Sequence, residues 1–171
     1  MLKGFKQITC FVFDVDGVLT DSTLLVLDDG QQARRMSIRD GYALQLAIKK
    51  GYKVLIISGA YSEAVKTRLN KLGIQDVFMK VENKEQLLSE YVKSNGLKKQ
   101  QVLFMGDDIP DYTVMKSVGL ACCPADAAPE IKHISQFISA SKGGKGCVRD
   151  VIEKVLKLNE HWDLDSSVAS K

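Results

Sequence analysis

The sequence lacks any long hydrophobic run, although 45% of its 171 residues are hydrophobic. A helix that crosses a bilayer needs about 18 or more consecutive apolar residues, and no stretch of the sequence provides them. The apolar run Ile8–Phe13 meets the charged Asp14 too soon to form the centre of a signal peptide. We therefore expect a protein without a membrane segment and with a cytoplasmic location.

Metal-binding cysteine and histidine patterns and a strong charge of one sign are also missing. The four cysteines show no CxxC spacing, and we expect both histidines, His133 and His161, to be structural or exposed. Reduced, buried cysteines are therefore favoured over disulfides or a zinc site. The formal net charge is only +3 and the lysines are scattered, so we expect neither nucleic acid nor a membrane surface as a partner.

What is present is an alternation of short apolar runs with helix-length segments over residues 1–160, which we expect to form one domain followed by a tail at 161–171. The expected strands are Ile8–Phe13, Lys53–Ile57, Val77–Met79, Val102–Met105, Leu120–Cys122 and Phe137–Ile138. The expected helices are Tyr42–Lys50, Ser62–Leu72, Lys84–Ser94, Asp111–Val118 and Val148–Leu158. Because the strands are nearly uninterrupted apolar runs, this order predicts an α/β fold, a Rossmann-like parallel sheet with helices on both faces.

One segment, about residues 24–37, breaks the alternation. Leu24–Leu27 and Gln31–Ser37 read as two short strands, and the intervening Asp29-Gly30 pair is typical of a hairpin turn. We predict a projecting hairpin. Its place directly after an acidic stretch favours a flap over a functional site, and a plain connection is the alternative.

Three of the expected strands are followed at once by polar side chains. Asp14 follows the first strand, Ser58 the second, and Asp107 with Asp108 the fourth. The carboxyl ends of parallel strands lie along one edge of a sheet, where the ligands of open α/β sheets bind. The sequence therefore predicts that carboxylates and a hydroxyl converge at one site.

Such a cluster fits the chemistry of phosphoryl transfer. Several carboxylates need a cation, and oxygen ligands favour Mg²⁺, which also binds phosphate oxygens. Ser58-Gly59 offers a hydroxyl and close backbone approach to a phosphate, and Lys84 offers a positive charge, although alone they could be a turn cap and a solvated lysine. Asp14 can attack phosphorus, and Asp16 can act as general acid and then general base.

Four stretches carry a family pattern: DVDGVLTD, ISG, Lys84 and GDDIPD. In this order they resemble the four motifs of haloacid dehalogenase-type phosphatases. SIRDGYAL, RLNKLGI, VGLACCPADA and GGKGCVRD extend the resemblance from Phe11 to Asp150, toward the subgroup of 3-deoxy-D-manno-octulosonate 8-phosphate phosphatases. The resemblance implies hydrolysis of a sugar-acid phosphate that feeds lipopolysaccharide synthesis.

The resemblance also implies roles for individual residues. Mg²⁺ would be held by Asp14, the backbone carbonyl of Asp16, and Asp107, with Asp108 and Asp111 near the metal or just behind it. The implied phosphate ligands are Ser58, Gly59 and Lys84. The implied contacts of the sugar acid are a loop, Ser37, Ile38, Arg39, Asp40 and Gly41, and, on a helix, Arg68.

No cap domain fits between the motifs, because Asp14 to Ser58 holds only the hairpin and one helix, and Ser58 to Lys84 only one helix and one strand. An uncapped site needs another means of excluding water. The resemblance implies a homotetramer in which the hairpin and the C-terminal segment help to enclose a neighbouring site.

Two alternative functions stay open. Ala60 and Gln45 stand where octulosonate phosphatases commonly carry arginine, so the sister group that acts on nononulosonate 9-phosphates is an alternative. From another class, a non-catalytic phospho-aspartate signalling domain also combines an acidic cluster, Mg²⁺, a hydroxyl and a lysine. Asp16 beside the candidate nucleophile Asp14 argues against it, since an acid/base there would shorten the lifetime of the phosphate.

Overall fold

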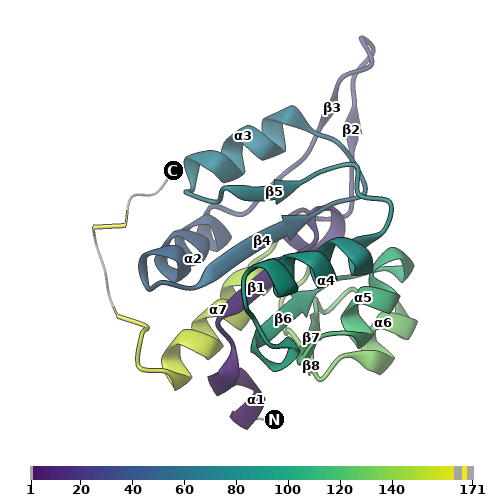
Figure 1. The fold of residues 1–171 in the computed structure, drawn as a ribbon. Helices are drawn as coiled ribbons and strands as arrows, with labels where there is room; N and C mark the ends of the chain where they lie inside the picture. The colour runs from purple at the N-terminus through teal and green to yellow at the C-terminus, as the bar shows by residue number, and fades with distance from the viewer. Residues whose placement is uncertain (1, 164–166, 169–171) are drawn as a thin grey trace.

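Six parallel strands form the central sheet of the protein, in the order β5-β4-β1-β6-β7-β8 (Figure 1). The structure is a computed structural model and describes residues 2–163 and 167–168. The strands are β1 (Cys10–Phe13), β4 (Lys53–Ile57), β5 (Asp76–Phe78), β6 (Val102–Met105), β7 (Leu120–Cys123) and β8 (Phe137–Ile138). The parallel sheet predicted from the apolar runs is thereby confirmed.

Helices cover both faces of this sheet and bury its alternating side chains in two separate cores. Phe11 and Phe13 of β1 belong to one core, whereas Cys10 and Val12 belong to the other. The first core is closed by α1 (Leu2–Gln7), α2 (Ile38–Lys49), α3 (Glu63–Lys71) and α7 (Cys147–Leu158), and the second by α4 (Lys84–Ser94), α5 (Tyr112–Lys116) and α6 (Pro129–Ile134). Neighbouring side chains of a strand point to opposite faces of the sheet. Because both faces are buried here, successive positions of a strand must be apolar, which explains the continuous apolar runs in the sequence.

Two helices were not predicted, and one begins earlier than predicted. Both α1 and α6 have six residues, too short to show a helical period. Helix α2 begins at Ile38 because the Ser37 hydroxyl caps it, accepting a hydrogen bond from the Asp40 amide at 3.3 Å. The stretch from Ile38 to Gly41 is therefore the first turn of a helix, which corrects our expectation of a loop.

The predicted hairpin is confirmed and projects from the body of the protein (Figure 1). Its strands, β2 (Leu25–Val26) and β3 (Gln32–Ala33), are shorter than expected. The turn follows the predicted chemistry: Gly30 adopts a positive φ of 82°, and the Asp29 carboxylate accepts a hydrogen bond from the Gln31 amide at 3.0 Å. Within the described residues no cap domain accompanies it.

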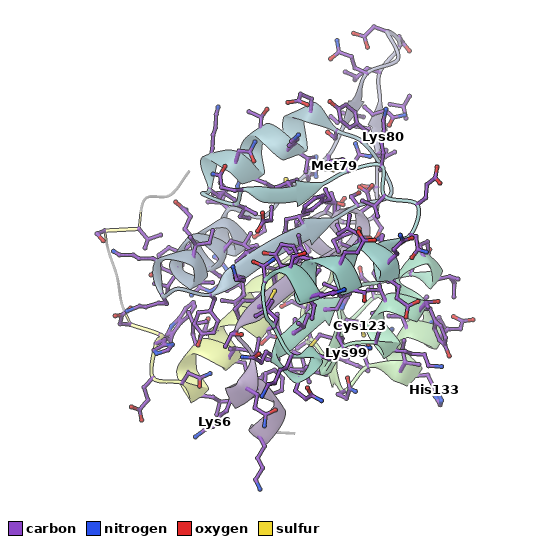
Figure 2. All side chains as sticks on the ribbon, viewed as in Figure 1. Lys6, Met79, Lys80, Lys99, Cys123 and His133 are labelled. Atoms are coloured by element: carbon purple, nitrogen blue, oxygen red, sulfur yellow. The ribbon has the colours of Figure 1, made fainter. Side chains whose placement is uncertain are left out.

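The expectations from scarce residue types can also be checked. All four cysteines are free and buried, and Cys123 lies inside the fold, whereas His133 projects from the outer surface of α6 (Figure 2). The first residue of the predicted tail, His161, contacts the body of the protein, because its Nδ1 lies 2.9 Å from the Tyr52 hydroxyl oxygen. Its residues 164–166 and 169–171 lie outside the described residues. None of the described helices combines the length and hydropathy that a bilayer crossing requires.

Truncating a side chain that both sheet and helices cover should destabilise the protein. Phe11 is 0% exposed and Phe78, on the edge strand, is 38% exposed. We expect Phe11→Ala to lower the free energy of unfolding by about 3–5 kcal/mol and Phe78→Ala by less than about 2 kcal/mol, measured by urea denaturation. Equal losses for the two variants would contradict the two-core arrangement.

Candidate active site

The topology brings three strand ends together at one edge of the sheet. Strand β1 lies in the middle and pairs with β4 on one side and with β6 on the other. Asp14 directly follows β1, Ser58 follows β4, and Asp107 lies two residues beyond β6. These side chains meet at a cleft of about 430 Å³. It is lined by Asp14, Asp16, Ser22, Ser58, Gly59, Ala60, Val81, Glu82, Lys84, Asp107, Asp108, Pro110 and Asp111.

A tight turn after β1 aims two carboxylates into this cleft. The Asp14 amide donates to the Met105 carbonyl at 3.1 Å, which ties the end of β1 to β6. Gly17 then reverses the chain with a φ of 87°, and its amide donates to the Thr20 hydroxyl at 3.2 Å. A side chain on Gly17 would collide with the Asp107 carboxylate. Glycine is therefore required at this position both by its conformation and by the space that Asp107 occupies.

The glycine-rich segment before α7 supports this turn from outside. The Gly144 amide donates to the Val18 carbonyl at 2.9 Å, and a side chain at Gly143 would collide with the Gly17 carbonyl. Gly143 and Gly144 of SKGGKGC therefore pack against the turn that carries Asp16.

Lys84 is the buried cation of the cleft. It occupies the first position of α4, where Asn83 caps the helix by accepting from the Gln86 amide at 2.9 Å. Its ammonium lies 2.9 Å from Asp14 Oδ1 and 2.7 Å from Asp111 Oδ1. Burial alone would lower the pKa of Lys84, but the two carboxylates outweigh it and raise that pKa, so the side chain stays charged.

Lys84 does not balance the negative charge of the cleft. Carboxylate oxygens of Asp14, Asp107 and Asp111 lie within 4.8 Å of one another. Burial, and secondly the Asp111 carboxylate, raise the pKa of Asp14 to about 7. Burial, followed by the Asp14 and Asp111 charges, likewise raises the pKa of Asp107 to about 7. The possible ligand atoms are all oxygens, and their negative charge exceeds the positive charge nearby. Both features favour a hard divalent cation such as Mg²⁺.

Asp111 and Ser58 complete the lining. One Asp111 oxygen accepts from Lys84, and the other accepts from the Asp107 amide at 3.1 Å, so Asp111 orients both groups. Ser58 is buried, and its hydroxyl oxygen accepts from the Ala60 amide at 3.2 Å. That contact leaves the hydroxyl proton to be donated to an anion.

The residues expected to contact a sugar acid do not line this cleft in the described part of a single chain. Ile38 and Arg39 are exposed on the first turn of α2, and Asp40 is buried against α7, where it accepts from the Arg149 amide at 2.7 Å. Burial raises the pKa of Asp40 to about 6. Arg68 lies beside Gly41, since a Cβ built there would be 3.4 Å from Arg68 Nη2. Their contact with substrate stays a prediction.

A residue that contacts an acid of the site, Arg34, was not predicted from the sequence. The Arg34 guanidinium, from the base of the hairpin, donates from Nε to Asp16 Oδ1 at 2.7 Å. The two residues are 18 positions apart, and no period or motif in the sequence joins them.

Comparisons with known proteins agree with this site. A family model described as haloacid dehalogenase-like hydrolase matches residues 70–152. The 3-deoxy-D-manno-octulosonate 8-phosphate phosphatase of Escherichia coli (strain K12) is 31% identical over 151 residues, which covers 88% of this chain and 80% of that protein. The corresponding Yersinia pestis protein is 32% identical over 156 residues, which covers 91% of this chain and 83% of the relative.

Solved structures give the same result in three dimensions. The crystal structure of the Yersinia pestis phosphatase has a TM-score of 0.91 at 29% identity and covers 94% of this chain and 86% of that chain. The Moraxella catarrhalis phosphatase, solved in complex with a magnesium ion, a phosphate ion and a KDO molecule, has a TM-score of 0.89 at 29% identity over 92% of this chain and 90% of that one.

The fold and the site define a hydrolase of the haloacid dehalogenase-like class, and the chain is a phosphatase acting on phosphomonoesters. Within that class it belongs to the 3-deoxy-D-manno-octulosonate 8-phosphate phosphatase family.

The raised pKa values predict how a divalent cation should affect stability. In the metal-free fold the pKa of Asp14 and of Asp107 is about 7, above the ordinary value of 3.8. The folded state thus holds these protons more tightly than the unfolded state, and the resulting stability is complete below pH 3.8 and lost as the pH rises through about 7. Because Mg²⁺ must displace the protons, the rise in Tm that it causes should be larger at about pH 8 than at about pH 5.5.

Differential scanning fluorimetry with and without MgCl₂ measures this difference without relying on activity. Asp107→Asn should lose most of the response to Mg²⁺, whereas Asp28→Asn, an exposed acid on the hairpin, should keep it. An equal rise in Tm at both pH values would count against the carboxylate cluster as the binding site.

Proposed function

We propose that the protein hydrolyses the phosphate ester of a sugar acid in a Mg²⁺-dependent reaction, with 3-deoxy-D-manno-octulosonate 8-phosphate as the preferred substrate. The observation that carries the proposal is the pairing of Asp14 with Lys84 at 2.9 Å inside a cleft that also holds Asp16, Ser58 and Asp107. The family relationship and the KDO molecule bound to the Moraxella relative support this choice of substrate.

The residues of the cleft can divide the reaction into two steps. The Asp14 carboxylate attacks phosphorus, the bond between phosphorus and the ester oxygen breaks, and Asp16 gives its proton to the departing alcohol. Asp16, now a carboxylate, takes a proton from water, whose oxygen attacks the aspartyl-phosphate and releases inorganic phosphate. Ser58 and Lys84 bind phosphate oxygens throughout, so the same donors hold the group in both steps.

Mg²⁺ would be held by Asp14, Asp107 and the backbone carbonyl of Asp16. When bound, it neutralises charge on the phosphate and on the carboxylates around it. Asp111 already accepts hydrogen bonds on both oxygens, so we assign it the role of orienting Lys84 and Asp107. Asp108, which accepts from the Ile109 amide at 2.8 Å, stands at the exposed rim.

The missing sugar contacts lead us to propose self-association, with a homotetramer as the expected form. Leu25 and Val26 of the hairpin are 63% and 65% exposed, and Leu24 and Leu27 beside them are also exposed. A projecting apolar hairpin with unpaired edges is suited to packing against another subunit. Such packing would let one chain enclose the cleft of the next, in place of the cap domain that the described residues do not contain.

Substitution of the two acids tests the chemistry. Asp14→Asn removes the nucleophile and Asp16→Ala removes the acid and base, so each should lower kcat by about 10³-fold or more while leaving the circular dichroism spectrum unchanged. Phosphate release from the octulosonate ester is the measurement. Substantial turnover by Asp14→Asn would contradict a covalent intermediate.

The identity of the sugar is tested by comparing substrates. We expect kcat/KM for the eight-carbon octulosonate 8-phosphate to exceed that for a nine-carbon nononulosonate 9-phosphate by about tenfold or more, which corresponds to about 1.4 kcal/mol. The reverse order would favour the sister group that acts on nononulosonate 9-phosphates. Ala60 does not decide between the two groups, because it matches the sequence pattern of neither.

A charge on the hairpin should disrupt the assembly. We expect Leu25→Asp combined with Val26→Asp to reduce the mass measured by light scattering and to raise KM several-fold, because the apolar contact is lost. Gln32→Glu adds negative charge to the same hairpin without removing apolar surface and should keep the wild-type mass. A wild-type protein that is already monomeric would refute the proposed assembly.

A further inference from the structure

Arg34 holds the carboxylate of Asp16 from the base of the hairpin. Its Nε lies 2.7 Å from Oδ1 and its Nη2 lies 3.3 Å from Oδ2, so both carboxylate oxygens face the guanidinium. The Arg34 side chain is only 5% exposed, whereas that of Asp16 is 38% exposed. The arginine is thus enclosed by the protein, and the acid is open to the cleft that it lines.

This geometry differs from that of an ordinary surface ion pair. The Lys145 ammonium, for example, lies 3.5 Å from Asp21 Oδ2, and the Lys145 side chain is 57% exposed. Such pairs restrict neither partner strongly. A buried guanidinium needs its counter-charge, because it has lost most of its contact with water. Two N–H···O contacts to different oxygens also restrict the plane of the carboxylate, which a single point charge cannot do.

Lys84 and Arg34 therefore form ion pairs with different acids. Lys84 contacts Asp14 and Asp111, whereas Arg34 contacts Asp16. Asp16 is also held through its backbone, in the turn that Gly17 and Thr20 close, so its remaining freedom is the rotation of its side chain. Arg34 acts on that rotation.

We propose that Arg34 is a positioning residue that sets the orientation of the Asp16 carboxylate for proton transfer. The inference rests on the proposed function, in which Asp16 protonates the leaving alcohol and then deprotonates water. The Nε contact at 2.7 Å holds Oδ1 and the Nη2 contact at 3.3 Å holds Oδ2, so the guanidinium limits rotation of the carboxylate. Since Arg34 directly follows β3, the position of the hairpin and the orientation of Asp16 are linked.

Three variants test this role in the full-length protein. Arg34→Ala removes both contacts, Arg34→Lys keeps the charge but cannot make two parallel contacts, and Arg35→Ala removes an adjacent, exposed arginine as a matched control. With octulosonate 8-phosphate we expect kcat to fall about 10- to 100-fold for Arg34→Ala and less for Arg34→Lys, with KM changed by less than about twofold. Arg35→Ala should match wild type in kcat.

An aryl phosphate separates positioning from general damage. Nitrophenolate leaves without help from an acid, so Arg34→Ala should still release a first burst of nitrophenolate at the wild-type rate and then turn over slowly, because Asp16 is still needed to activate water. In an Asp16→Asn background, adding Arg34→Ala should leave the burst rate unchanged. A slower burst in either background would mean that Arg34 acts on Asp14 or on the phosphate, and would overturn the proposal.

The remaining outcomes are also decisive. If wild type hydrolyses neither ester, the proposed function itself fails. If wild type is active and Arg34→Lys matches it in kcat, the orienting role fails while the proposed function stands. Circular dichroism and light scattering establish that each variant folds and assembles as wild type does, and if Arg34→Ala does not, Arg34→Lys alone decides.

Discussion

The mutual repulsion of carboxylates at the end of β1 is the constraint around which the rest of the site is arranged. Carboxylate oxygens of Asp14, Asp107 and Asp111 lie within 4.8 Å of one another. The buried ammonium of Lys84 contacts two of these carboxylates, Asp14 and Asp111. Burial, followed by neighbouring carboxylates, raises the pKa of Asp14 and of Asp107 to about 7, so the fold disfavours their charged forms. Two hydrophobic cores on either side of β1 keep the strand ends in place against that repulsion.

Support for the site comes from segments that are distant in sequence. The turn after β1 is held by Met105 of β6 and by Gly143 and Gly144 before α7. Asp111 lies at the junction of a short turn and α5, and it connects Lys84 with Asp107. Each acid therefore has a backbone or side-chain contact that orients it. Catalysis of phosphoryl transfer depends mainly on such preorganised positioning and on electrostatic stabilisation.

Features of the fold and the site could be predicted where a local sequence pattern specifies them, and could not where they depend on contacts between distant segments. Asp14, Ser58 and Asp107 were predictable as neighbours because each follows an apolar run, and parallel strands end at one edge. The start of α2 at Ile38, the packing of Gly143 on the turn and the contact of Arg34 with Asp16 depend on how distant segments meet, which no local period records. The hairpin was recognisable from its turn, but the sequence pattern did not indicate which of its side chains would contact Asp16.

A separation between chemistry and recognition follows from this arrangement. One chain gathers the acids, the lysine and the hydroxyl of the reaction in its own cleft. The residues that the family resemblance assigns to the sugar, around Arg39 and Arg68, lie on α2 and α3 and do not line that cleft within the described part of the chain. In the self-association proposed above, a second copy would cover the opening of the cleft. In the assembly proposed above, the exposed apolar hairpin, whose base carries Arg34 to Asp16, would connect the covering surface to the proposed acid and base.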